Sequence, residues 1–494
     1  MKYPALAFFL TFLLAANAAS QNKPVPRLET APCAVEVPKG ENPECGFLVV
    51  RENRASNSSK TIKLPIVILK SENPTPKPDP VLRTLGGPGA SSLRLIRSRR
   101  ASPWLRDRDY IIFEQRGTRY AQPALDCPEV NESTAASAKS KLDQAAAKRD
   151  VVRAAKQCYD RLNRSGIDLA GYNSAESASD IDDLRRVLKL DKINLYGVSY
   201  SAGLMLNVMR YHPEGIRSVV IESTLPPEIN YDEVGVDGMV RSLNELFKSC
   251  RQDTDCNSAF PRLESEFYDV VAKLNHEPLV APTKDPKTGE TFDIHLSGDD
   301  FATWIVDYLF SNEPAATVEA PYVIHQAFAG NFIDPFKRYA GDKLGGSSYS
   351  WGMRYSFWCS EEFPFEKMAK IRAQSFKYPG LKGYEVMALP DICSVWKVKP
   401  APPIANRPVI SGIPTLVIAA QYDSYTDPQW SRNLAKRLKN SFFVEMPWAG
   451  HGPGFSVPCV ATMIADFYEA PEKRPSDDCA AKTKAQFKFL IKKS

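Results

Sequence analysis

The chain has 494 residues, which is enough for a large core with an insertion or for more than one domain. Its formal net charge of +5 is small for this length, so a general role in nucleic-acid binding is not indicated. Beyond the N-terminal segment, no apolar run reaches the roughly 20 residues that a transmembrane helix needs, so we expect no membrane span.

The N-terminus has the pattern of a secretory signal peptide. Lys2 precedes an apolar run over residues 5–16, and Ala16-Asn17-Ala18 supplies small residues for cleavage. We therefore assign residues 1–18 to a signal peptide. The mature protein is expected to be secreted or periplasmic.

Ten cysteines fit this compartment, because disulfides persist outside the cytosol. The sequence cannot fix their connectivity, and pairing neighbours along the chain is our prediction. A zinc site is the competing interpretation, but there is no Cys-x-x-Cys pair and no histidine at ligand spacing. The predicted pairs are Cys33–Cys45, Cys127–Cys158, Cys250–Cys256, Cys359–Cys393 and Cys459–Cys479.

The first half of the chain alternates between apolar runs and amphipathic stretches. Such alternation of strands and helices indicates a parallel α/β sheet. The predicted strands are residues 47–50, 62–69, 81–85, 110–113, 193–195 and 218–222, and the predicted helices are 133–162 and 179–190.

The alternation fails from about residue 226 to 407, where the pattern is helical and rich in aromatic residues. A buried-strand pattern then resumes at 414–420. We interpret 226–407 as a helical cap inserted into one α/β domain. The core would then consist of a first part, 19–225, and a C-terminal part, 408–494.

A stretch near the middle of the chain has the layout of a nucleophile elbow. An apolar strand is followed by Gly197, one spacer and Ser199, and then by apolar residues at helical spacing. In such an elbow a strained turn projects the serine hydroxyl and leaves the next N–H free for an oxyanion. Ser201 stands where the usual Gly-x-Ser-x-Gly pattern has its last glycine. Alone, the pattern also fits a buried serine in a turn.

A serine nucleophile needs a base, and His451 suits this role best among five histidines. It stands between Gly450 and Gly452 after a predicted strand at 442–444, and glycine lets the ring approach the serine closely. The other histidines are His212, at the end of the elbow helix, and His276, His295 and His325 in the expected cap.

The orienting acid is expected after a strand that lies between the serine and the histidine in the chain. Asp423 directly follows the strand ending at Ala420 and is our candidate. Asp427 is the alternative, although its position also suits the N-cap of the next helix.

The oxyanion site needs two backbone N–H donors. One is expected from Tyr200, the residue after the nucleophile. The other is expected from Gly87, in the Gly86-Gly87-Pro88-Gly89 loop after an early strand, where the backbone is bare. Such a loop is otherwise an ordinary turn.

Together these segments resemble the prolyl and tripeptidyl aminopeptidase branch of the α/β-hydrolase family. The resemblance covers essentially the whole mature chain, in order, and its C-terminal part looks like the domain of the tripeptidyl members. The matching segments are 86–89, 114–117 (Glu-Gln-Arg-Gly), 197–201, Asp423 and 450–452. Departures from the branch pattern are Leu85, Glu114, Ser201 and Asp427, none of which removes a reacting group.

The resemblance implies an α/β-hydrolase fold with a mostly parallel sheet, helices on both faces and an inserted helical cap. It also implies cleavage near a free peptide N-terminus, with cap carboxylates that hold the substrate ammonium. The family's Cys-x-Asp/Glu resembles Cys359-Ser360-Glu361, so Glu361 is the first candidate and Glu362 the second. Both also fit solvated surface glutamates.

Several arginines near the expected site have less specific interpretations. Arg116 is expected to brace the oxyanion loop rather than to touch substrate. Four arginines after the loop could bind acidic substrate groups, but a solvated helix face is the favoured interpretation. They are Arg94, Arg97, Arg99 and Arg100.

The sequence therefore predicts a secreted serine hydrolase that needs no cofactor and no metal. An aminopeptidase that releases short peptides or single residues through an acyl-enzyme fits best. A carboxylesterase with the same triad is the alternative, because the triad does not distinguish an ester from an amide. A non-catalytic binding protein on a hydrolase scaffold is the third possibility. The expected partner is a peptide or small ester substrate, and the oligomeric state is not predicted.

Overall fold

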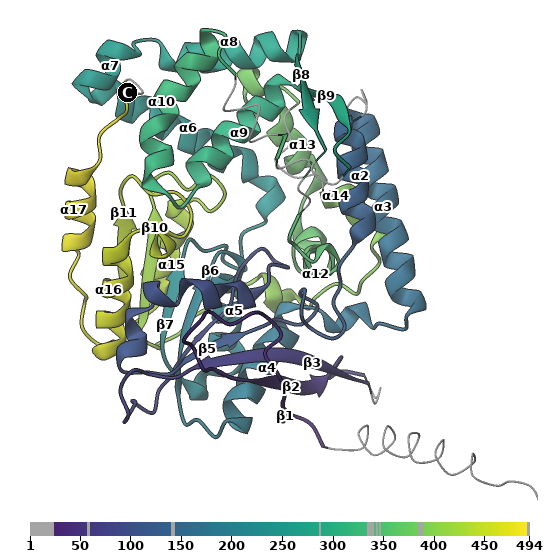
Figure 1. Cartoon of the computed structure of the whole chain (residues 1–494), viewed down its shortest axis with the longest axis vertical. Coiled ribbons are helices and arrows are strands. Elements are labelled where there is room, and N and C mark those ends of the chain that lie inside the picture. Colours follow the sequence, from purple (N-terminus) through teal and green to yellow (C-terminus); the bar gives the residue numbers. More distant parts are fainter. Residues whose placement is uncertain are drawn as a thin grey trace, which may run out of the picture.

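The computed structural model describes residues 24–56, 60–139, 144–285, 288–332, 340–341, 344, 347–383 and 389–491. Figure 1 shows one sheet-based layer below and a mainly helical layer above it. The expected signal peptide lies outside the described residues.

One twisted sheet forms the lower layer, and across the described residues it has nine strands in the order β1-β2-β3-β5-β4-β6-β7-β10-β11. The strands from β5 onward in this order pair in parallel, while β1, β2 and β3 are antiparallel. Every apolar run expected as a strand contributes to this sheet. The strands are β1 (Arg27–Thr30), β2 (Glu44–Arg51), β3 (Thr61–Leu69), β4 (Val81–Arg83), β5 (Tyr110–Phe113), β6 (Ile193–Val198), β7 (Ile216–Glu222), β10 (Thr415–Ala420) and β11 (Ser441–Met446).

Helices cover both faces of the sheet, so the central strands are buried on both sides. On one face, α4 (Ser174–Val187), α5 (Tyr200–Tyr211) and α15 (Pro428–Arg437) pack on residues such as Leu195 and Val417. On the other face pack the 3₁₀ segments η1 (Ser92–Ala101) and η2 (Pro103–Arg106) and the helix α16 (Pro458–Glu469). Burial on both faces explains why these strands are continuous apolar runs.

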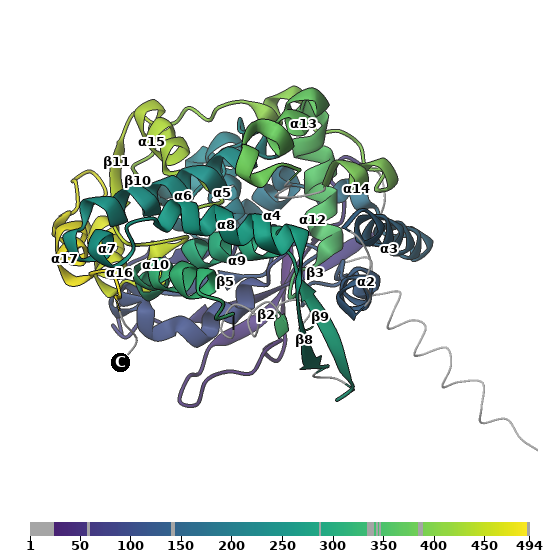
Figure 2. The same cartoon turned by 90° about the horizontal axis from the view of Figure 1, so that it is seen from above.

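The segment between β7 and β10 adds no described strand to this sheet and forms the upper layer, over the core in Figure 2. Its apolar residues build a separate core around Leu243, Phe267, Phe301 and Ile324. A hairpin, β8–β9, interrupts the helices and was not expected from the helical pattern. The elements are α6 (Gly235–Gln252), α7 (Thr254–Ala259), α8 (Leu263–His276), β8 (Leu279–Lys284), β9 (Thr291–Leu296), α9 (Gly298–Phe310), α10 (Pro314–Phe328), α12 (Trp351–Phe357), a π-helical turn η6 (Trp358–Glu362), α13 (Met368–Lys377) and α14 (Leu389–Val395).

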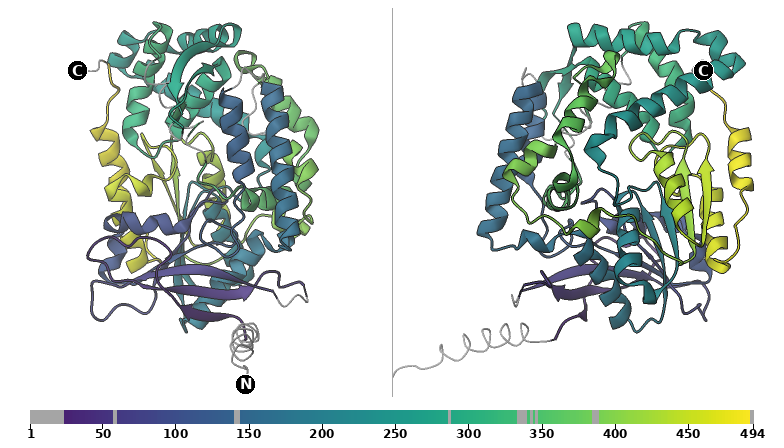
Figure 3. Two further views of the ribbon diagram at one scale, coloured as in Figure 1. Left: turned by 45° about the vertical axis from the view of Figure 1, so that its right-hand side comes forward. Right: turned by 180° about the vertical axis from the view of Figure 1, so that it is seen from behind.

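The helices α2 (Pro128–Lys139) and α3 (Gln144–Arg164) precede the elbow in the chain but do not pack on the sheet. They stand beside the inserted segment in Figure 3, and α3 contacts α14. Their buried side chains, such as Leu162, share one core with Met353 and Trp396.

All ten cysteines are paired, and the five predicted disulfides are the ones observed: Cys33–Cys45, Cys127–Cys158, Cys250–Cys256, Cys359–Cys393 and Cys459–Cys479. The last of these ties α16 to α17 (Asp478–Gln486). Disulfides of this kind restrict the unfolded chain and so stabilise the folded one.

Among the described helices, none is both long enough and apolar enough to cross a membrane.

Arg116 does not brace the oxyanion loop, so that expectation was wrong. Its guanidinium is fully buried and forms two parallel hydrogen bonds of 2.7 Å with the Asp180 carboxylate on α4. It also donates to the carbonyl of Glu52 at 2.6 Å. Arg116 therefore joins the end of β5 to α4 and to the edge of β2. The bidentate geometry is the strong form of this ion pair.

Replacing Arg116 by methionine should lower the free energy of unfolding by about 3 kcal/mol, because the buried Asp180 charge loses its bidentate partner. Denaturant unfolding followed by tryptophan fluorescence measures the loss. The control is Arg153→Met, since Arg153 is 68% exposed in its pair with Asp150. It should cost less than about 0.5 kcal/mol. Equal losses in the two variants would contradict the assignment.

Candidate active site

Ser199 lies in a strained turn between β6 and α5, with φ 64° and ψ −131°. Non-glycine residues rarely adopt positive φ, and when they do they cluster at functional sites. Two glycines allow the turn: a Cβ on Gly197 would lie 2.4 Å from the Ser201 carbonyl oxygen, and one on Gly86 would lie 2.7 Å from the Ser199 Cβ. The predicted elbow geometry is therefore present at this serine.

Ser201 is accommodated where the usual pattern has glycine because its buried hydroxyl is hydrogen-bonded. The side chain is fully buried, and Oγ donates to the Thr84 carbonyl oxygen at 3.1 Å. The Thr84 hydroxyl also contacts it. The departure thus adds a link between the elbow helix and the loop that follows β4.

Asp423 and His451 meet although 28 residues separate them in the chain. The His451 Nδ1 lies 2.8 Å from the Asp423 Oδ2. Thr426 adds two donors to this carboxylate: its N–H reaches Oδ1 at 2.8 Å and its hydroxyl reaches Oδ2 at 2.5 Å. Asp423 is fully buried, and burial alone would raise its pKa, but the attraction of His451 and these hydrogen bonds hold the pKa below the ordinary value. The carboxylate is therefore kept ionised.

Asp427, the alternative acid, caps a helix instead. It is the N-cap of α15 and accepts from the Gln429 N–H at 2.8 Å. Its other oxygen lies 3.5 Å from the Arg241 guanidinium. No hydrogen bond between Asp427 and His451 is recorded, although both residues are described.

Glu222, the last residue of β7, holds both the serine turn and the histidine loop. Its carbonyl accepts from the Ser199 N–H at 3.0 Å, and its carboxyl accepts from the Gly454 N–H and the Tyr196 hydroxyl, each at 2.6 Å. The side chain is fully buried, and burial raises its pKa. The two loops are therefore attached to one strand end.

The His451 ring is held from the side of the inserted segment. It stacks on Phe310, the last residue of α9, with ring centroids 4.3 Å apart, and the His451 N–H donates to the Phe310 carbonyl at 2.8 Å. The structure records no hydrogen bond between Ser199 and His451, both of which are described. Hydrogen bonds of this kind often tighten only when substrate is bound.

The glycine loop lies directly against the elbow. A Cβ on Gly86 would lie 3.1 Å from the Tyr200 nitrogen, so the loop and the start of α5 are in close contact. Gln115 braces this loop by donating to the Leu85 carbonyl at 2.6 Å. Within the described residues, the N–H groups of Gly87 and Tyr200 have no recorded acceptor. Both donors proposed from the sequence are thus on adjacent backbone segments.

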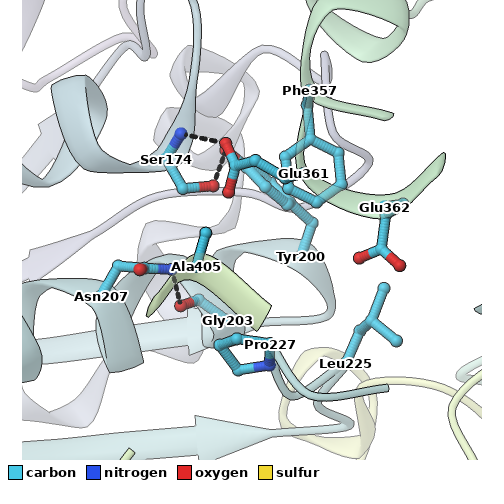
Figure 4. Close-up of a pocket in the computed structure, with 10 residues that line it drawn as sticks. All are labelled: Ser174, Tyr200, Gly203, Asn207, Leu225, Pro227, Phe357, Glu361, Glu362 and Ala405. Atoms are coloured by element: carbon cyan, nitrogen blue, oxygen red, sulfur yellow. Dashed lines mark hydrogen bonds between the residues drawn. The ribbon is translucent and has the colours of Figure 1, made fainter. Parts of the chain in front are cut away.

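Glu361 and Glu362 are buried and not solvated. Together with Tyr200 they line a pocket (Figure 4). Its volume is about 320 Å³, and part of this volume is open to solvent. Glu361 turns toward the start of α4 and accepts from the Ser174 N–H at 2.6 Å. Glu362 lies above Leu225, with one contact of 3.4 Å from the Tyr231 N–H. The remaining lining residues are Gly203, Asn207, Pro227, Phe357 and Ala405.

Burial and neighbouring acids make these carboxyls hard to ionise. Burial raises the pKa of Glu361 to about 7. It also raises the pKa of Glu362 well above the ordinary value, and the charge of Glu366 adds to this. Glu366 itself is raised to about 8 by burial and by Asp232. A cation that enters the pocket would lower these pKa values, because a nearby opposite charge favours the ionised form of a carboxyl.

Other side chains singled out from the sequence lie apart from this arrangement. Arg94 and Arg97 are exposed on η1, while the side chains of Arg99 and Arg100 lie outside the described residues. One described group has metal-ligand spacing, Cys127, Glu129 and Cys158, and its two cysteines form a disulfide.

Sequence reasoning missed Thr426, Glu222 and Phe310. Thr426 follows the acid by three residues, and such a hydroxyl is a recognisable local cap for a carboxylate. Glu222 carried a weaker signal, as an acidic residue at the end of an otherwise apolar strand. Phe310 carried none, because its contact with His451 is purely tertiary.

Comparison with known proteins agrees with the fold. The family model described as the alpha/beta hydrolase fold matches residues 86–456. The tripeptidyl aminopeptidase of Streptomyces lividans is 25% identical over 441 residues, covering 84% of this chain and 80% of that protein. The serine protease Hip1 of Mycobacterium tuberculosis is 21% identical over 368 residues, covering 67% of each chain.

A proline iminopeptidase structure from Mycobacterium smegmatis is also similar to this chain. It is 13% identical with a TM-score of 0.39, and the match covers 86% of this chain and 98% of that one.

Asp423 should make stability depend on pH. Because its pKa in the folded chain lies below 3.8, the ionised carboxylate stabilises the fold above that value, and the contribution is lost as pH falls through the folded pKa. The difference in unfolding free energy between wild type and Asp423→Asn should therefore shrink as pH falls below about 4. Urea titrations at several pH values measure it. Asp427→Asn is the control, since asparagine caps helices equally well. A difference that does not change with pH would contradict the prediction.

Proposed function

The chain belongs to the α/β-hydrolase fold family, and from this premise we propose that it is an exported serine hydrolase acting as an aminopeptidase. The observation that carries the proposal is the Asp423–His451 hydrogen bond, attached through Glu222 to the same strand end as the strained Ser199 turn. Five disulfides support an exported protein, because they persist in oxidising compartments.

In the proposed mechanism, Ser199 attacks the substrate carbonyl while His451 accepts the hydroxyl proton. Because Nδ1 faces Asp423, Nε2 is the ring nitrogen left for the serine. The N–H groups of Gly87 and Tyr200 bind the oxyanion. Collapse of the tetrahedral intermediate transfers the proton to the leaving group, and water then hydrolyses the acyl-enzyme by the same steps in reverse.

The aminopeptidase assignment is supported by the pocket and by the named relatives. A tripeptidyl aminopeptidase is similar over 84% of the chain. The pocket that starts at Tyr200, one residue from the nucleophile, contains two buried carboxyls and an otherwise largely apolar lining. A free α-ammonium is a cation of the right charge for such carboxyls. In this reading, residues 226–407 form the cap that supplies both carboxyls.

Glu362 suits the ammonium better than Glu361, which reverses the order expected from the sequence. Glu361 already accepts from Ser174 at 2.6 Å. Glu362 is 3% exposed, and among the described residues its one hydrogen-bond contact is the 3.4 Å contact from the Tyr231 N–H. A buried carboxyl with so little compensation is the group that gains most from a bound cation. We assign Glu362 as the main anchor and Glu361 as a secondary one.

Ser199→Ala should abolish hydrolysis and labelling by a fluorophosphonate probe while the circular dichroism spectrum stays unchanged. Asp423→Asn should lower kcat by about 10³-fold or more, because the imidazole loses the partner that fixes its tautomer. Asp427→Asn is the matched control and should leave kcat within about twofold, since it keeps the helix cap. Failure of the probe to label the wild type would instead favour a non-catalytic binding protein.

Acetylating the substrate N-terminus should remove most activity on a peptide p-nitroanilide. Glu362→Gln should raise KM about tenfold or more for the free peptide, as expected on losing a charge-assisted contact, and should not affect a p-nitrophenyl ester. Glu361→Gln is the paired variant and should have the smaller effect. Equal rates on free and acetylated peptides, with faster ester hydrolysis, would support the carboxylesterase alternative.

A further inference from the structure

The N-terminal part of α12, in the inserted segment, lies on the glycine loop. The Ser350 N–H donates to the Gly89 carbonyl at 2.9 Å, and a Cβ on Gly89 would lie 2.7 Å from the Ser350 carbonyl oxygen. One turn further along, the Arg354 Nη1 donates to the Gly87 carbonyl at 2.5 Å. A cap helix thus touches the segment that carries the proposed oxyanion donor.

Arg354 is fixed in this position by its surroundings. The residue is 7% exposed, and its guanidinium lies 5.2 Å from the Trp358 ring centroid, 5.6 Å from that of Tyr349 and 5.9 Å from that of Trp351. Each such contact attracts the cation and restricts its motion. The guanidinium is therefore a rigid donor and not a mobile surface charge.

Gly87 needs an external restraint. Its φ of 124° and its missing side chain leave the backbone free to rotate, and a rotated peptide would turn the N–H away from the oxyanion. The Gly87 N–H and the Gly86 carbonyl share one planar peptide, and the carbonyl accepts from the Ala90 N–H at 3.3 Å. That contact is long. The short bond from Arg354 restrains the next peptide.

We propose that Arg354 is a positioning residue. By holding the Gly87 carbonyl, it limits rotation of the backbone at Gly87, so that the N–H of the preceding peptide points at the oxyanion. This inference rests on the proposed function. Because the bond between Ser350 and Gly89 involves only the backbone, it survives substitution of Arg354. The loop then stays in place while the backbone at Gly87 becomes free to rotate, so substitution of Arg354 should weaken stabilisation of the transition state.

The test uses the full-length oxidised protein, p-nitrophenyl acetate as substrate and a small trifluoromethyl ketone as the probe that forms an oxyanion with the serine. Arg354→Met should lower kcat/KM about tenfold to a hundredfold, less than the loss of an oxyanion donor itself. The ketone Ki should rise by the same factor. Arg354→Lys keeps the charge without the planar fork and should recover part of both. Arg372→Met removes an exposed cap arginine and should change neither.

Unchanged kcat/KM and Ki in Arg354→Met would overturn the proposal, as would a fall in kcat/KM without a matching rise in Ki. If the methionine variant does not fold by circular dichroism, the lysine variant decides, and an unchanged Ki there overturns the proposal. Wild-type protein that neither hydrolyses the ester nor reacts with a fluorophosphonate would instead overturn the proposed function, and this inference with it.

Discussion

The backbone of Ser199 is held at a positive φ that non-glycine residues rarely adopt, and neighbouring parts of the core stabilise this conformation. Such a conformation costs of order 1–3 kcal/mol and persists only where the surroundings enforce it. The enforcement comes from the strand end of β7, which accepts the Ser199 N–H, and from the close approach of Gly86. The parallel strands matter because they bring these chain segments to one edge of the sheet.

The inserted segment lies over the core and also contacts the loops that carry the site residues. Phe310 stacks on the histidine, the Ser424 hydroxyl next to the acid donates to the Val306 carbonyl at 3.0 Å, and Arg354 binds the glycine loop. Three loops of the core therefore each contact a helix of the insertion. The geometry of the site therefore depends on contacts between the core and the inserted segment.

Much of the core followed from the sequence because its determinants are local. Apolar runs such as Thr415–Ala420 are buried on both faces and are therefore short and continuous, which is typical of strands in a parallel sheet. The turn at Ser199 and the pairing of neighbouring cysteines were also readable. Other features depend on which distant residue each side chain contacts in the fold, and this cannot be read from the local sequence. They are the role of Arg116, the proposed preference for Glu362 over Glu361 as the ammonium anchor, and the contacts of Arg354. The β8–β9 hairpin was hidden because its strands are short and half exposed, with little apolar signal.

The disulfide between Cys359 and Cys393 lies just before the two pocket glutamates and fastens the π-helical turn η6 to α14. Before oxidation, that turn lacks the covalent restraint that seats two poorly solvated acids next to each other. Under the proposed function, the pocket would gain this covalent restraint only after export to an oxidising compartment.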